Sequence, residues 1–134
     1  MKRVVLDASA LMTFFLGRPG AEKVGELFAS AAEGKKELLM SVVNWGEVYY
    51  SIWRDRGRED AEKALTYIGQ LPIEIVDADL DLTRLAAELK AQYKLPYADC
   101  FAAALAEDRR ASVLTSDRDF SLVKDRVPVL WAVS

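Results

Sequence analysis

The stretch Arg3-Val-Val-Leu-Asp-Ala-Ser-Ala10 decides the fold of this chain. Val4 to Leu6 form an uninterrupted apolar run, which is typical of a strand buried on both faces of a parallel sheet. Asp7 ends this run, and residues 8–16 have the pattern of a short helix. Taken alone, Asp7 is most simply explained as the N-cap of that helix. Its place after a central strand is also where open α/β sheets concentrate their binding sites.

Further apolar runs alternate with helical patterns along the rest of the chain. The runs that we interpret as strands are 37–40, 72–76, 111–115 and 127–131. Helical periodicity covers 21–32, 41–55, 58–69, 77–93 and 96–108, and 116–120 has the composition of a loop or short turn. Strands that alternate with helices predict a parallel sheet covered on both faces. We therefore expect a single α/β domain over residues 1–134, with a central parallel sheet of about five strands.

The composition limits the chemistry. The chain has 134 residues, no histidine and one cysteine, Cys100. A Ser-His-Asp triad, a Cys-His pair and a His-ligated zinc site are therefore excluded within it. A metal site would use carboxylates, carbonyls and water, which select hard ions such as Mg²⁺ or Mn²⁺.

The same composition bears on the compartment. A lone cysteine excludes an internal disulfide framework and is typical of the reducing cytoplasm. No apolar run is long enough to span a membrane, and the N-terminus does not resemble a signal peptide. We expect a cytoplasmic protein with no membrane association.

Four acidic residues are expected to meet at the carboxyl edge of the sheet. Asp117 follows the fourth strand as Asp7 follows the first, while Asp99 lies in the first turn of the helix between the third and fourth strands. Glu47 lies early in the helix after the second strand. Two carboxylates about 4 Å apart repel by roughly 4 kcal/mol at an effective dielectric of about 20. A divalent ion removes this cost, lowers the pKa of a coordinated water and aligns attack on a phosphodiester.

The acids lie in four short motifs that together resemble PIN-domain ribonucleases, specifically the VapC-type toxins of toxin–antitoxin pairs. The motifs, in the family's order over nearly the whole chain, are Val4-Val-Leu-Asp-Ala-Ser-Ala-Leu11, Asn44-Trp-Gly-Glu-Val48, Leu95-Pro-Tyr-Ala-Asp-Cys-Phe-Ala-Ala-Ala-Leu-Ala106 and Leu114-Thr-Ser-Asp-Arg-Asp-Phe120. The resemblance implies a PIN-like three-layer α/β/α fold and a metal-dependent endoribonuclease.

The resemblance also implies roles for individual residues. The catalytic quartet that holds one or two Mg²⁺ or Mn²⁺ ions would be Asp7, Glu47, Asp99 and Asp117. Ser9 and Thr115 match small hydroxyl positions that bind water or orient the acids, and Asp119 matches a less constant supporting position. The implied partners are an RNA substrate, a second copy of the chain in a homodimer, and a cognate antitoxin that obstructs the site.

Several arginines are candidates for contacting phosphate groups. The net charge of −3 argues mildly against a nucleic-acid partner, although setting the four site carboxylates aside leaves a slightly positive remainder. Arg18 and Arg118 lie in loops near the predicted edge and are the candidates for binding substrate. We interpret the run Arg54, Arg56 and Arg58 as a solvated helix end.

The helix at 41–55 carries four large aromatic residues: Trp45, Tyr49, Tyr50 and Trp53. They pack either in the core or in a dimer or antitoxin interface, where aromatic residues are enriched.

Two other functions stay open. One is a PIN-like binding module without catalysis. The other is a receiver-type phosphoacceptor domain, which normally has paired acids after the first strand and a lysine after the last. Asp7 has no acidic neighbour, no lysine follows 127–131, and Asp77 is the only acid placed as a phosphoacceptor after the third strand.

Overall fold

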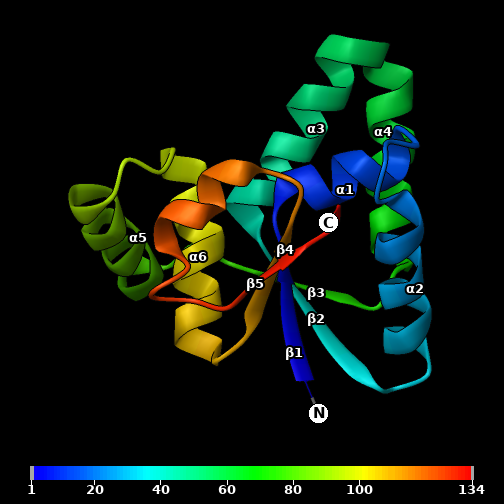
Figure 1. Ribbon diagram of the computed structural model, residues 1–134. Coiled ribbons are helices and arrows are strands. Elements are labelled where there is room, and N and C mark those ends of the chain that lie inside the picture. Colours follow the sequence, from blue (N-terminus) through cyan, green and yellow to red (C-terminus); the bar gives the residue numbers. More distant parts are fainter. Residues whose placement is uncertain (1, 134) are drawn as a thin grey trace.

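Five parallel strands form one sheet in the computed structural model, which describes residues 2–133 (Figure 1). The strand order is β3-β2-β1-β4-β5. The strands are β1 (Lys2–Leu6), β2 (Lys36–Ser41), β3 (Ile73–Val76), β4 (Ser112–Thr115) and β5 (Val129–Trp131). This confirms the expected α/β class and the central parallel sheet of five strands.

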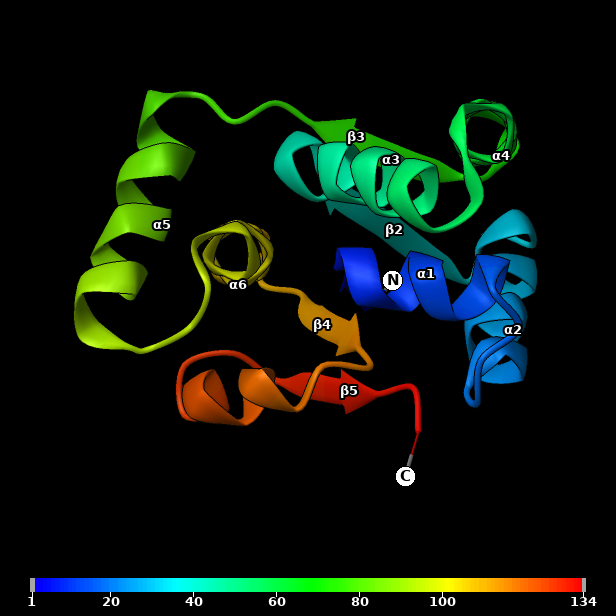
Figure 2. The same ribbon diagram turned by 90° about the horizontal axis from the view of Figure 1, so that it is seen from above.

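Helices cover both faces of the sheet (Figure 2). They are α1 (Ala8–Phe15), α2 (Ala21–Ala32), α3 (Val42–Arg56), α4 (Arg58–Gln70), α5 (Leu80–Gln92), α6 (Tyr97–Arg109) and the 3₁₀ helix η1 (Arg118–Val123). The core has two halves. Val5 packs with α5, α6 and η1, whereas Val4 and Leu6 pack with α1 to α4. The central apolar run is thus buried on both faces, and the three layers are those expected.

The strand order reverses between β1 and β4, which are paired with Leu6 opposite Leu114. In doubly wound sheets, ligands bind outside the carboxyl ends of the strands at such a switch point. Asp7 and Asp117 follow these two strands.

Receiver-type sheets have the order 2-1-3-4-5, with the third strand inside. Here β3 is an edge strand, so Asp77 lies away from the switch point and the receiver alternative loses its acceptor.

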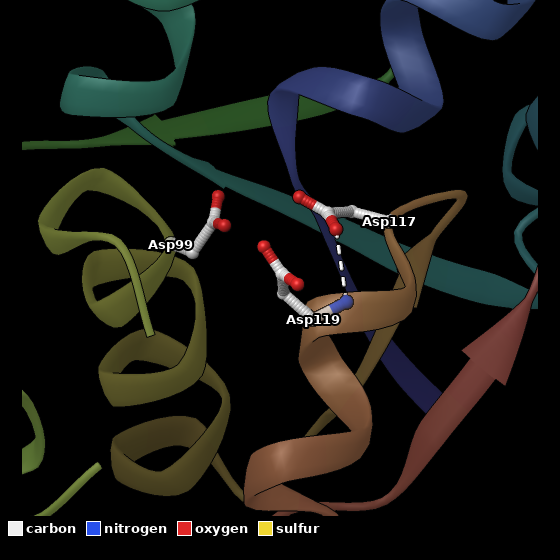
Figure 3. A group of neighbouring side chains, drawn as sticks. All are labelled: Asp99, Asp117 and Asp119. Carbon is white, nitrogen blue, oxygen red and sulfur yellow. Dashed lines mark hydrogen bonds between the residues drawn. The ribbon is translucent and has the colours of Figure 1, made fainter. Parts of the chain in front are cut away.

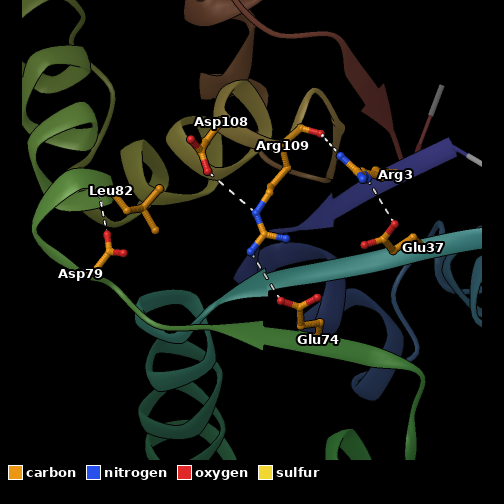
Figure 4. A network of polar contacts seen from close by, with 7 residues as sticks. All are labelled: Arg3, Glu37, Glu74, Asp79, Leu82, Asp108 and Arg109. Atoms are coloured by element: carbon orange, nitrogen blue, oxygen red, sulfur yellow. Dashed lines mark hydrogen bonds and ion pairs between the residues drawn. The ribbon is translucent and has the colours of Figure 1, made fainter.

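Two boundaries differ from the sequence prediction because aspartates cap the elements. The helix predicted from residue 77 begins at Leu80, since the Asp79 carboxylate accepts a hydrogen bond from Leu82 N at 2.9 Å (Figure 4). The segment predicted as a loop or short turn continues as η1. Asp117 caps η1 by accepting from Asp119 N at 2.9 Å.

Two arginines connect elements at the opposite edge of the sheet (Figure 4). Arg109, the last residue of α6, lies 3.5 Å from Glu74 on β3. Arg3 lies 3.2 Å from Glu37 on β2 and donates to Arg109 O at 3.0 Å. Partly exposed ion pairs of this kind contribute at most about 1 kcal/mol each. They link the end of α6 to strands that are distant in sequence.

Within residues 2–133, every helix is too short or too polar to cross a bilayer.

Gly20 yields a test of how the segment after β5 is held. Its φ is +100°, and a Cβ there would lie 2.8 Å from Ala132 O. Gly17 also has positive φ, +61°, but faces open space. Gly17→Ala should therefore cost only the backbone strain, about 1 kcal/mol, and Gly20→Ala at least about 1 kcal/mol more. Urea denaturation measures both. Equal losses would show that the close approach to Ala132 contributes nothing.

Candidate metal centre

Three aspartates bring their carboxylates together at the switch point (Figure 3). One oxygen each from Asp99, Asp117 and Asp119 lies within 4.8 Å of the others. Asp99 is the third residue of α6, Asp117 follows β4, and Asp119 lies in the first turn of η1. Asp99 is buried and Asp119 is exposed. Asp119, which the sequence predicted only as a supporting residue, therefore lies beside two members of the quartet, Asp99 and Asp117.

Asp7 is fixed from three sides. Its carboxylate caps α1 by accepting from Ala10 N at 2.9 Å, so the N-cap explanation is confirmed as a structural fact. Ser9 Oγ lies 2.9 Å from both Asp7 oxygens, and Thr115 Oγ1 donates to Oδ2. The structure thus brings both predicted hydroxyl positions onto Asp7. These donors orient a carboxylate that is only 1% exposed.

The same hydroxyls hold the loop that carries Asp117. Thr115 Oγ1 accepts from Asp117 N at 2.9 Å, and Ser9 Oγ accepts from Ser116 N at 2.9 Å. Thr13 Oγ1 lies 2.7 Å from Ser116 Oγ. Thr13 and Ser116 were not singled out from the sequence. The one available signal was the i, i+4 spacing of Ser9 and Thr13, which places both hydroxyls on one side of α1.

Glu47 is positioned by Asn44, one turn earlier on α3. Asn44 is fully buried, and its Nδ2 donates to Glu47 Oε1 at 2.8 Å and to Ala98 O at 3.1 Å. Because both partners are acceptors, the amide nitrogen must face them. Asn44 therefore connects α3 to the first turn of α6, next to Asp99. Its Oδ1 has no hydrogen-bond partner within residues 2–133. From the sequence, Asn44 is only the first residue of the motif that carries Glu47.

Burial and mutual repulsion oppose ionisation of these acids. Burial raises the pKa of Asp99 to about 8, with further contributions from the charges of Asp7, Asp117 and Glu47. Burial raises the pKa of Asp7 to about 6, against the lowering effect of its hydrogen bonds. The pKa of Glu47 is also raised, mainly by burial. A positive charge among them would remove this penalty.

The oxygen atoms of this group are suitable ligands for a hard divalent cation. The group consists of carboxylates with neighbouring hydroxyls, the ligand chemistry of Mg²⁺ and Mn²⁺ rather than of softer ions. The single thiol, Cys100, is buried. The raised pKa values are those expected of buried carboxylates that share one site without a cation, and a bound cation would lower them.

A cavity of about 420 Å³ opens beside the group, lined by Glu47, Asp99 and Asp117. Arg18 also lines this cavity, as its assignment to substrate binding requires, and lies 3.9 Å from Asp55. Arg118 is not among the lining residues. Its guanidinium lies over the ring of Trp131, 5.0 Å from the centroid. The prediction that it contacts phosphate gains no support from this placement.

Arg54 adds to the sequence interpretation. It is exposed in the last turn of α3, as a solvated helix end requires, and it also lines the cavity with the acids. Arg56 instead lines a separate cavity with Phe15 and Leu16, and Arg58 lies over the ring of Trp53 at 5.4 Å. The spacing of seven residues between Glu47 and Arg54, two turns of α3, was the signal that places both on one face.

The raised pKa of Asp99 predicts how the stability of the metal-free protein depends on pH. The folded pKa of about 8 exceeds the unfolded value near 3.8, so the folded state binds the proton more tightly. This contribution is complete below the unfolded pKa and is lost as the pH rises through about 8. In EDTA the melting temperature should fall from about pH 4 to about pH 8 and level off above that. Asp99→Asn should flatten this fall.

Asp81→Asn is the control, because Asp81 is an exposed acid on α5 outside the group. The Asp81→Asn variant should show the same fall of melting temperature with pH as the wild type. A melting temperature for the wild type that does not change over this range would contradict the raised pKa.

The PIN domain family model matches residues 4–126. No curated protein matches the chain in sequence. Among solved structures, VapBC2 from Rickettsia felis bound to a promoter DNA fragment is similar at 16% identity and a TM-score of 0.75, covering 96% of this chain and 98% of that one. DNA-bound VapBC from Salmonella typhimurium is similar at 16% identity and 0.74, covering 98% and 99%.

Mycobacterium tuberculosis VapC20, described as a toxin that cleaves the sarcin-ricin loop, is similar at 18% identity and a TM-score of 0.73, covering 88% of this chain and 92% of that one. At these identities the likeness is one of fold, and it confirms the expected PIN-like architecture. The acids occupy the switch point of this fold, and the family model spans nearly all of the sequence. The chain therefore belongs to the PIN-domain family.

Proposed function

We propose that this chain is an endoribonuclease that hydrolyses RNA phosphodiester bonds with Mg²⁺ or Mn²⁺, and that it acts as the toxin of a toxin–antitoxin pair. The observation that carries the proposal is the convergence of Asp7, Asp99 and Asp117 beside Glu47 at the switch point of a PIN-family sheet. Cytoplasmic action is part of the proposal and is consistent with the free thiol of Cys100.

The proposed ligands are the quartet Asp7, Glu47, Asp99 and Asp117, with Asp119 as an additional carboxylate. These residues would hold a divalent ion, which would supply a coordinated water of lowered pKa and positive charge beside the phosphate under attack. Ser9 and Thr115 keep Asp7 in one orientation, so that the carboxylate does not need to rearrange. Asn44 aims Glu47, whose side chain reaches the cavity, and Glu47 either completes the ligand set or orients the attacking water.

The assignment as a toxin is supported by the similar folds. The Rickettsia and Salmonella structures are VapBC assemblies, and the Mycobacterium protein is described as a cleaving toxin. We extend to this chain a cognate antitoxin and a homodimer as partners. On α3, Trp45 and Tyr49 are partly buried against the core, whereas Tyr50 and Trp53 are 48% and 43% exposed. The two exposed rings are the proposed contribution of α3 to a protein interface.

The test of the proposed function is cleavage of total cellular RNA by the purified chain. Cleavage should require Mn²⁺ and stop in EDTA. Asp99→Asn should lower the rate by about a hundredfold or more, because a neutral amide is a much weaker ligand. Asp81→Asn should cleave at the wild-type rate. Wild-type rates from the Asp99 variant would remove that residue from the site. A folded chain that binds Mn²⁺ and cuts no RNA would favour the binding-module alternative.

Metal binding has a separate readout that does not depend on finding the right RNA. Mn²⁺ should raise the melting temperature of the wild type, because a ligand that binds only the folded state stabilises it. Asp117→Asn should reduce this shift, and Asp81→Asn should not. If the wild type shows no shift at any Mn²⁺ concentration, the proposed metal site is wrong.

A further inference from the structure

One face of α3 joins the acidic group to a basic side chain. Glu47, Ser51 and Arg54 are spaced by four and three residues, which places them on the same side of the helix. All three line the cavity that Asp99 and Asp117 also line. At about 1.5 Å per residue, Arg54 lies about 10 Å along the helix axis from Glu47. Arg18 and Asp55 line the cavity as well, so Arg54 leaves the end away from the acidic group with a net positive charge, and we call this the basic end.

The charge of Arg54 is available to a ligand. Among residues 2–133, Arg54 forms no ion pair, and its guanidinium lies over the ring of Tyr50, 5.8 Å from the centroid. Arg18, on the same cavity, is partly neutralised by Asp55 at 3.9 Å. The Tyr50 ring supports the Arg54 guanidinium without satisfying its hydrogen-bond donors.

The acidic end poses a problem for a polyanion. Carboxylates repel every phosphate of a nucleic-acid strand, and a bound cation offsets that repulsion only locally. Neighbouring phosphates need their own cation, and a guanidinium binds phosphate oxygens bidentately. The separation along α3 places Arg54 beyond the phosphate that the acids address.

We propose that Arg54 binds a phosphate of the RNA strand next to the one that is cleaved, so that the basic end of the cavity sets how the strand enters the site. This inference rests on the proposed function, because it takes RNA as the ligand. It identifies Arg54 as a substrate-binding residue rather than a metal-binding one.

The test compares Arg54→Ala, Arg54→Lys and Arg56→Ala. Arg56→Ala is the matched control, because it removes the same charge from the same helix. Arg56 lines the separate cavity beside Phe15 and Leu16. Binding of fluorescein-labelled oligouridine in EDTA measures backbone contacts without cleavage. Arg54→Ala should raise the Kd roughly three- to tenfold and lower the salt slope of log K by about 0.7, the contribution of one phosphate on a single strand. Arg54→Lys keeps the charge but not the bidentate geometry, so it should restore the salt slope and only part of the affinity. Arg56→Ala should match the wild type.

Kinetics separate this contact from metal binding. On a transcript that spans a cut site mapped in total RNA, Arg54→Ala should raise KM with little change in kcat, and the Mn²⁺ melting shift should be unchanged. Equal KM and Kd for the Arg54 and Arg56 variants would overturn the proposal. An Asp99→Asn variant that cleaves normally would instead overturn the proposed function. The two failures are therefore distinguishable.

Discussion

Repulsion among buried carboxylates is the interaction on which the rest of the candidate site depends. Asp7 and Asp99 have raised pKa values because the fold removes them from water and sets them beside other acids. A protein accepts such an arrangement only where something else offsets it, and a divalent cation is the simplest agent with the right charge. The neighbouring hydroxyls and Asn44 fit this picture, because they orient the acids without neutralising them.

The scaffold explains why these acids meet. A parallel sheet brings the carboxyl ends of β1 and β4 to one edge, and the change in strand order leaves space between the helices that follow. Asp7 and Asp117 come from those two ends. Asp99 joins them from the first turn of α6, where the helix dipole favours an anion. The position of each acid therefore follows from how its own element begins or ends.

Much of this was predictable from local pattern. The buried run at Val4 to Leu6 and the alternation of strands with helices predicted the sheet, and the acids at strand and helix ends predicted the edge where they gather. Three features were not predictable in this way. Asn44 donates a hydrogen bond to Ala98 on a different helix, and Thr13 is hydrogen-bonded to Ser116. Arg54 lines a cavity whose walls come from distant segments. Helical spacing places Thr13 beside Ser9 and Arg54 beside Glu47 on one helix face, but it does not identify the distant residues that each of them meets.

The acids are distributed over the chain from Asp7 to Asp119. Asp7 and Asp117 follow β1 and β4, Glu47 and Asp99 lie on α3 and α6, and Asp119 lies in η1. A growing polypeptide therefore holds no complete site until β4 has left the ribosome and paired with β1. A copy truncated before residue 117 would lack the Asp117 and Asp119 carboxylates, and a partly folded copy would not bring them beside Asp7. Synthesis itself thus delays assembly of the acidic group until β4 and η1 have been made. Under the proposed function, that ordering confines hydrolysis to molecules in which β4 has paired with β1.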